Sequence, residues 1–166
     1  MKRKMRFVWE EIKPLIRVQG AGTKDFLHGQ TTADIKAAKE GEIIRSCWLT
    51  ATGRVRALLE IILDKQGADV LVLAGCSADV LDGFEKVIFP ADQVKLDSQI
   101  EVKRLQLIDV CEKSNYQDVV WTINNTFDLK SWEPYDVGDF EQFERWRLEQ
   151  GIPLSEGEIN GKNNPF

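Results

Sequence analysis

The sequence is poor in the side chains that most often bind metal ions. Its 166 residues include one histidine, His28, and three cysteines, Cys47, Cys76 and Cys111, with no CxxC pair among them. Metal sites usually draw on several histidines, cysteines or carboxylates at short spacing. The sequence therefore predicts no metal site. Three widely spaced cysteines also predict reduced thiols, as is typical of a cytoplasmic protein.

Long apolar segments and an excess of positive charge are both missing. No run approaches the ~18 apolar residues that cross a bilayer, and no apolar segment follows the basic residues 1–6 as it would in a signal peptide. The net charge is -5, whereas nonspecific nucleic-acid binding needs many cations to displace phosphate counterions. We therefore expect a soluble protein with no membrane partner and no direct nucleic-acid binding.

Motifs of nucleotide binding and nucleophilic catalysis are missing as well. Gly20-Ala21-Gly22 follows a predicted strand, but the GxGxxG fingerprint would need a glycine at the position of Asp25. There is no P-loop and no GxSxG elbow. These glycines are therefore interpreted as a tight turn into a helix. Acid–base chemistry by carboxylates stays open, because 27 acidic residues offer many pairs.

What the sequence does contain predicts an α+β fold. With 43% hydrophobic and 30% charged residues, the chain can bury a core. Hydrophobic periodicity predicts, in order, a strand at 15–18, a short helix capped by Thr23, a hairpin of 43–49 with 55–63, a strand at 70–74, a helix capped by Ser77 and ended by Pro90, and a strand at 94–96. This order predicts a ferredoxin-like α+β unit over residues 15–98.

The remaining residues predict part of a second unit. Strands are expected at 102–110 and 118–123, and a helix from Val137 to Gln150 that Gly151 and Pro153 stop. Two strands and one helix make a poor domain, so residues 1–14 and 99–166 are expected to form a second, incomplete α+β unit. Unpaired strand edges in such a unit predict self-association as a homodimer or poor solubility.

Four blocks of the sequence resemble the YgfZ-type folate-binding proteins, relatives of the T-protein aminomethyltransferase of the glycine cleavage system. Residues 146–153, Trp-Arg-Leu-Glu-Gln-Gly-Ile-Pro, are similar to the family's R-x-E-x-G-(I/L)-P signature. Residues 26–34 are similar to its FLxGQxTxD block, 49–55 to its LxxxGRV hairpin and 89–94 to its next block. The blocks occur in the family's order, within residues 12–155.

The resemblance implies a folate site that includes Glu149. In the related transferases a glutamate of this signature binds the pterin ring of tetrahydrofolate. A carboxylate can accept two adjacent pterin N–H groups at once. From spacing alone, the same segment is a solvated charge ladder with the i,i+4 pairs Glu141–Arg145 and Arg145–Glu149.

Four other residues are candidates for the same site. The resemblance suggests polar contacts from Gln30 and Thr32, and stacking of the pterin on Trp48, which is equally suited to the core. Arg147 either orients Glu149 or meets the glutamate tail of the folate. No catalytic residue is assigned.

The sequence departs from the resemblance at two points. The transferases carry an Asp-Asp pair after the hairpin turn, one aspartate of which is needed for catalysis; the matching residues here are Arg56 and Ala57. The YgfZ-type motif KGCYxGQE is missing before the sequence ends at Phe166, which suggests either a fragment or a shortened relative.

The expected function is therefore that of a tetrahydrofolate-binding accessory protein. The resemblance implies support of iron–sulfur enzyme maturation or repair and of tRNA modification, with iron–sulfur enzymes as partners. Two alternatives stay open: a folate-dependent aminomethyltransferase-like enzyme, and a structural or interaction module that has lost the ligand.

Overall fold

A computed structural model describes residues 6–110, 119–122, 135–153 and 158–159. The chain divides into two compact units. We call Pro14–Ile100 with Pro153–Phe166 the large unit, and Met1–Lys13 with Glu101–Ile152 the small unit. The elements are β1 (Arg6–Gln19), α1 (Thr23–Gln30), β2 (Ile43–Leu49), β3 (Val55–Leu63), β4 (Gly67–Gly75), α2 (Ser77–Glu85), the 3₁₀ turn η1 (Pro90–Asp92), β5 (Lys95–Asp109), β6 (Val119–Thr122) and α3 (Phe140–Gln150).

The predicted α+β class is confirmed. In the large unit the strands follow the order β2-β3-β4-β1, and each neighbouring pair is antiparallel. The element order β1-α1-β2-β3-β4-α2-β5 has one strand more than the βαββαβ pattern. In the small unit β5 pairs antiparallel with β6, with Lys103 opposite Thr122.

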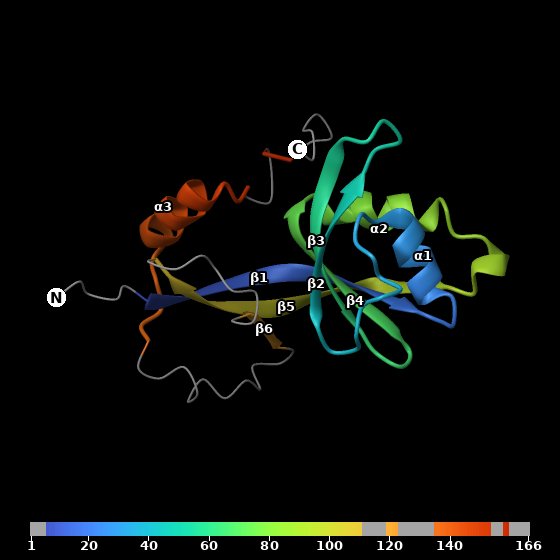
Figure 1. Cartoon of the computed structure of the whole chain (residues 1–166), viewed down its shortest axis with the longest axis horizontal. Coiled ribbons are helices and arrows are strands. Elements are labelled where there is room, and N and C mark those ends of the chain that lie inside the picture. The colour runs from blue at the N-terminus through green and yellow to red at the C-terminus, as the bar shows by residue number, and fades with distance from the viewer. Residues whose placement is uncertain (1–5, 111–118, 123–134, 154–157, 160–166) are drawn as a thin grey trace. The chain divides into compact units, whose positions relative to one another are not determined.

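The core of the large unit lies between its sheet and two helices (Figure 1). Alternate residues of β3 are buried, as the period of two requires: Ala57, Leu59, Ile61 and Leu63. They share one cluster with Phe26 and Leu27 of α1 and with Val80 and Phe84 of α2. Both helices therefore cover the same face of the sheet, and the rings of Phe26 and Phe84 meet edge to face, with 5.5 Å between their centroids.

The core of the small unit combines aromatic stacking with a buried polar group. Trp9 stacks on Phe143 of α3, with ring centroids 4.1 Å apart and planes 4° from parallel. Arg104 is almost fully buried, and its Nη1 donates to Gln106 at 3.0 Å and to Glu11 at 3.3 Å. A buried guanidinium needs such acceptors, because its charge cannot be neutralised.

Several element limits differ from those predicted. β1 begins at Arg6 rather than Leu15, and the strands predicted at 94–96 and 102–110 form one continuous β5. Charged residues interrupt the apolar alternation in both segments. The limits of β1 and β5 therefore depend on pairing with neighbouring strands more than on strand propensity. α2 has Cys76 at its N-cap and α1 has Gly22, so the predicted caps Ser77 and Thr23 are each the first helical residue.

The turn Gly20-Ala21-Gly22 is explained by a close backbone contact. A Cβ on Gly20 would lie 2.0 Å from the Gln93 carbonyl oxygen, and one on Gly22 would lie 1.6 Å from that of Asp92. Gly20 also has a φ of 122°, which side chains disfavour. The two glycines therefore let the chain after β1 pass directly against the chain after η1.

An ion pair fixes the turn between β3 and β4. Asp64 accepts from Nη1 and Nη2 of Arg17 on β1, at 2.5 and 2.9 Å, and from the N–H groups of Gln66 and Gly67. The Arg17 guanidinium lowers the pKa of Asp64 to about 2. Burial instead raises the pKa of Asp69, although Arg17 also contacts it at 3.3 Å.

These two shifts predict opposite effects of removing the charge. Because Asp64 has a lowered pKa in the folded state, its contribution is present above pH ~4 and is lost as the pH falls toward 2. Asp64→Asn should lower the free energy of unfolding at pH 7 by about 1 kcal/mol, since the carboxylate is half exposed. The difference from wild type should vanish near pH 2 in urea titrations.

Asp69→Asn provides the matched comparison at the same guanidinium. Its raised pKa means that ionisation opposes folding at neutral pH. This variant should unfold at pH 7 at the same or a higher urea concentration than wild type. Equal destabilisation by both substitutions would contradict the assignment.

Candidate functional site

A pocket of about 520 Å³ in the large unit is lined by all three predicted site residues of that unit. It lies between the end of α1, the β2–β3 hairpin and α2. Its lining is Gly29, Gln30, Thr31, Thr32, Trp48, Leu49, Thr50, Ala51, Arg56, Gly83, Lys86 and Val87. Its volume is in the usual range for small-molecule sites. We call it the Arg56 pocket.

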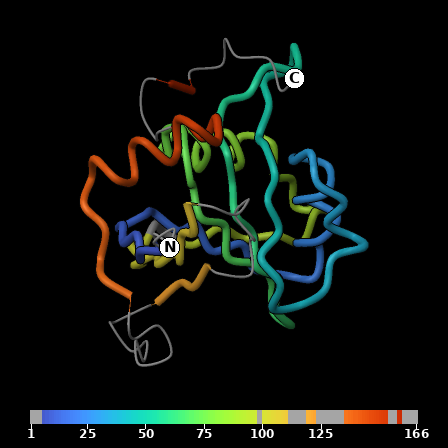
Figure 2. The backbone as a smooth tube through the Cα atoms, turned by 60° about the vertical axis from the view of Figure 1, so that its left-hand side comes forward, coloured from blue at the N-terminus to red at the C-terminus, as the bar shows by residue number. Residues whose placement is uncertain are grey.

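The segment after α1 runs beside β2 (Figure 2), and Gln30 and Thr32 line the pocket. Thr31 forms a bridge with Trp48. The Thr32 N–H donates to the Cys47 carbonyl at 3.1 Å, and the Cys47 N–H donates to Thr32 Oγ1 at 2.9 Å. The FLxGQxTxD-like block therefore ends α1 and then pairs with the strand that carries Trp48.

Trp48 belongs to the core and also lines the pocket. Only 6% of it is exposed, and its ring meets Phe84 edge to face at 5.9 Å. The Arg56 guanidinium carbon lies 4.4 Å from the centroid of the Trp48 ring, a cation–π contact. A ligand ring that stacks on this face would have to displace Arg56.

The pocket lining is cationic. It includes Arg56 and Lys86 and no acidic residue. Both cations have carboxylate neighbours on α2: Arg56 Nη2 lies 3.7 Å from Asp79, and Lys86 Nζ lies 2.6 Å from Asp82. The sequence indicates Arg56 only as a departure from the transferases, and it gives no prediction for Lys86. The only indication for Lys86 in the sequence is its place near the end of the helix predicted after Ser77. In the structure it is the C-cap residue of α2.

Cys47 is beside this pocket but does not suit nucleophilic chemistry. Burial raises the pKa of its thiol, and the thiolate is the reactive form. Among the residues that the structure describes, no group of three or more His, Cys, Asp or Glu side chains is placed to hold a metal ion. In the same part of the chain, no helix is long and apolar enough to cross a membrane.

The signature segment forms α3 of the small unit. Asp139 accepts from the Gln142 N–H at 2.8 Å, while Gln142 accepts from the Asp139 N–H at 3.0 Å, a capping box. The helix ends at Gly151, whose φ of 67° is the left-handed conformation predicted for a glycine stop. The helix thus begins at Phe140, three residues after the predicted start.

Arg147 and Glu149 have different environments on α3. Arg147 is buried; its Nε donates to Glu144 at 2.6 Å and its Nη1 to the Ile152 carbonyl at 3.1 Å. Glu149 is exposed. Within the described residues, neither ladder pair, Glu141–Arg145 or Arg145–Glu149, forms an ion pair. The buried Arg147 instead joins the helix to the Gly-Ile-Pro segment that follows it.

The predicted site residues therefore divide between the two units. Gln30, Thr32 and Trp48 line one pocket of the large unit. Glu149 and Arg147 belong to α3 of the small unit.

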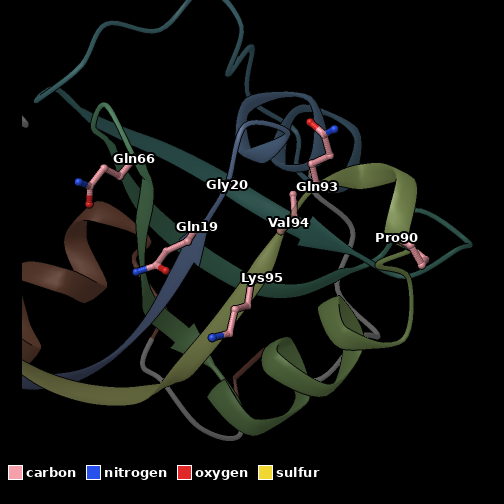
Figure 3. A pocket seen from close by; sticks show the side chains of 7 residues that line it. All are labelled: Gln19, Gly20, Gln66, Pro90, Gln93, Val94 and Lys95. Atoms are coloured by element: carbon pink, nitrogen blue, oxygen red, sulfur yellow. The ribbon is translucent and has the colours of Figure 1, made fainter.

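Two further pockets of the large unit lack converging functional groups. One, of about 530 Å³, is lined by Gln19, Gly20, Gln66, Pro90, Gln93, Val94 and Lys95. In Figure 3 the side chains of Gln66, Pro90 and Gln93 point away from one another. The other, of about 570 Å³, shares Gly29, Gln30 and Val87 with the Arg56 pocket and is lined by two carboxylates, of Asp25 and Asp92. Each carboxylate has a partner: Asp25 pairs with Lys36, and Asp92 accepts from the Phe89 N–H.

The fold belongs to a recognisable structural class, an α+β sheet like that of the aminomethyltransferases. The chain resembles the crystal structure of the glycine cleavage system aminomethyltransferase T from Bartonella henselae, with a TM-score of 0.52 and 20% sequence identity. The match covers 63% of this chain and 29% of that chain, so this chain corresponds to under a third of that protein. No protein-family model matches, and no curated protein gives a significant sequence match. The likeness shows the fold.

The contact between Gly83 and Trp48 predicts a large effect of one methyl group. A Cβ on Gly83 would lie 2.3 Å from the Trp48 ring. Gly83→Ala should therefore lower the free energy of unfolding by about 1–3 kcal/mol through overpacking, although alanine is the better helix former.

Gly29→Ala is the control in the other helix of the same unit. No atom lies within 4 Å of its added Cβ, so this variant should be neutral or more stable by up to about 1 kcal/mol. Thermal and urea unfolding of both variants measure the contrast. A Gly83→Ala protein as stable as Gly29→Ala would show that Trp48 is not packed as described.

Proposed function

We propose that this chain binds a reduced folate, tetrahydrofolate or a derivative, and that it is a binding protein of the YgfZ type. One observation carries the proposal. Gln30 and Thr32 of the 26–34 block line one pocket with Trp48 and Arg56. The volume of this pocket and its few polar groups are those of a usual small-molecule site.

The chemistry of these side chains suits a folate. The Gln30 amide and Thr32 hydroxyl each donate and accept hydrogen bonds, as the polar heteroatoms of a folate require. Glu149 is exposed at the end of α3, and its carboxylate is accessible to a ligand. In this proposal its two oxygens accept from the pterin ring N–H and amino group.

Arg147 acts as a positioning residue in this proposal. Its bonds to Glu144 and to the Ile152 carbonyl tie the last turns of α3 to the chain beyond Gly151. Buried hydrogen-bonded groups of this kind hold neighbouring residues in one geometry. Glu149, two residues away, is thereby carried on an ordered helix end.

Arg56 favours binding over aminomethyl transfer. It occupies the position where the resemblance expects a transferase aspartate, and a guanidinium does not release its proton in proteins. The general-base and electrostatic roles of that carboxylate are therefore not available from this residue. The proposal assigns the chain an accessory role, in support of iron–sulfur enzymes and of tRNA modification, which rests on the YgfZ resemblance.

Calorimetric titration of the full chain with tetrahydrofolate, under reducing anaerobic conditions, tests the proposal. Glu149→Gln keeps the shape of the side chain but removes its charge and one acceptor. It should weaken binding by about 2 kcal/mol, or about 30-fold, since a charge-assisted pair contributes about that much.

Glu141→Gln is the matched control, because Glu141 is also an exposed acid of α3 but lies in the first turn. It should bind like wild type. If Glu149→Gln and Glu141→Gln bind tetrahydrofolate equally well, the carboxylate–pterin contact is refuted. If the wild-type chain does not bind tetrahydrofolate at all, the proposed function itself is refuted.

A further inference from the structure

Helix α3 of the small unit exposes two large apolar side chains on one row. Phe140 and Leu148 are 60% and 62% exposed, whereas Phe143 and Trp146 of the same helix are buried. The two exposed residues are eight positions apart, so they lie on the same side of the helix, about 12 Å apart along its axis. Single exposed apolar residues are ordinary, but two on one row form a stripe that can pack against another helix.

The residue between them does not oppose such packing. Glu144 lies on the same row, midway between Phe140 and Leu148, and a carboxylate there would normally be costly to remove from water. Its charge is compensated within the helix, because Nε of the buried Arg147 donates to it at 2.6 Å. The stripe is therefore apolar at both ends and paired in the middle.

A row of alternating charge runs beside the stripe. Glu141, Arg145 and Glu149 follow one another at a spacing of four, and all three are exposed. Within the part of the chain that the structure describes, none of the three forms an ion pair. Arg145 therefore keeps its charge for a carboxylate of another molecule, and the two glutamates keep theirs for a cation.

This combination of rows is complementary to itself. If two α3 helices pack antiparallel about a two-fold axis at Glu144, Phe140 meets Leu148 of the second copy. The charged rows then lie on the same side of the pair. Arg145 comes within about 3 Å, along the axis, of Glu141 of the second copy. Each contact occurs twice, as an isologous interface requires.

The charges also distinguish a second copy from other occupants. A uniformly acidic partner would meet Arg145 but be repelled by Glu141 and Glu149, and a uniformly basic partner would meet the reverse. A surface that alternates in sign matches one that alternates in the same way. The second copy supplies this pattern together with the apolar residues that flank it.

We infer that two copies of this chain associate through α3, packed as an antiparallel pair. This surface differs from the strand edges from which the sequence predicts self-association. A helix of 11 residues gives a small interface, at the weak end of specific association. The dimer should therefore exchange with monomer at micromolar concentrations. The inference does not depend on folate binding.

Sedimentation equilibrium of the full chain, over about 5 to 500 µM, tests the association. Wild type should fit a monomer–dimer equilibrium. Leu148→Ser should weaken dimerisation about 10-fold or more, because the stripe loses a large apolar side chain. Phe89→Ser is the matched control, since Phe89 is 65% exposed but belongs to the large unit; it should dimerise like wild type.

Exchange of the two charges tests the geometry of the pair. Arg145→Glu and Glu141→Arg should each weaken the dimer about 10-fold or more, since like charges then face each other. The double variant restores opposite charges across the axis and should dimerise nearly as well as wild type. Lys39→Glu, at an 82% exposed side chain of the large unit, controls for net charge and should have no effect.

Circular dichroism of each variant checks that the fold is kept, as expected for exposed positions. A wild-type chain that stays monomeric over the whole range overturns the inference. A dimer that survives both Leu148→Ser and Arg145→Glu overturns it as well, and assigns the association to another surface, such as a strand edge. Loss of the dimer in Arg145→Glu without recovery in the double variant overturns the antiparallel pairing.

Discussion

The packing of Trp48 is the contact on which the pocket depends. Its ring lies against Gly83 and Phe84 of α2, with Arg56 on a face of the ring. Because Gly83 lacks a side chain, the helix backbone comes close enough to be in contact with the indole. The same ring thus joins the hairpin to α2 and supports the guanidinium. The packing of the core and the position of this pocket-lining cation are consequently not independent.

In α3, Arg147 is the buried side chain that organises the end of the helix. Its guanidinium is withdrawn from solvent and connects Glu144 with the carbonyl of Ile152, beyond the glycine that ends the helix. The R-x-E pattern therefore combines an arginine that organises the helix end with an exposed carboxylate. In this arrangement the two charged residues of the signature differ: Arg147 is buried among local hydrogen bonds and Glu149 is exposed.

The sequence predicted the features that depend on local pattern. The hairpin followed from strict alternation in β3, and the end of α3 from a glycine that accepts positive φ. The length of β1 was not predictable, since its first half gains order from pairing rather than from propensity. The lining of the Arg56 pocket was predicted in part: Gln30, Thr32 and Trp48 came from the resemblance, but Lys86 is distant in sequence and enters only through the fold.

The glycines at positions 20 and 22 have a consequence for reading mutational data. Both stand where another backbone segment passes within the radius of a methyl group, and neither lines the Arg56 pocket. In a saturation scan selected for activity, these two positions would tolerate as few residues as a true ligand contact. Intolerance to substitution at these two positions alone would then suggest a dinucleotide-binding loop. The actual constraint is the close spacing between two main-chain segments.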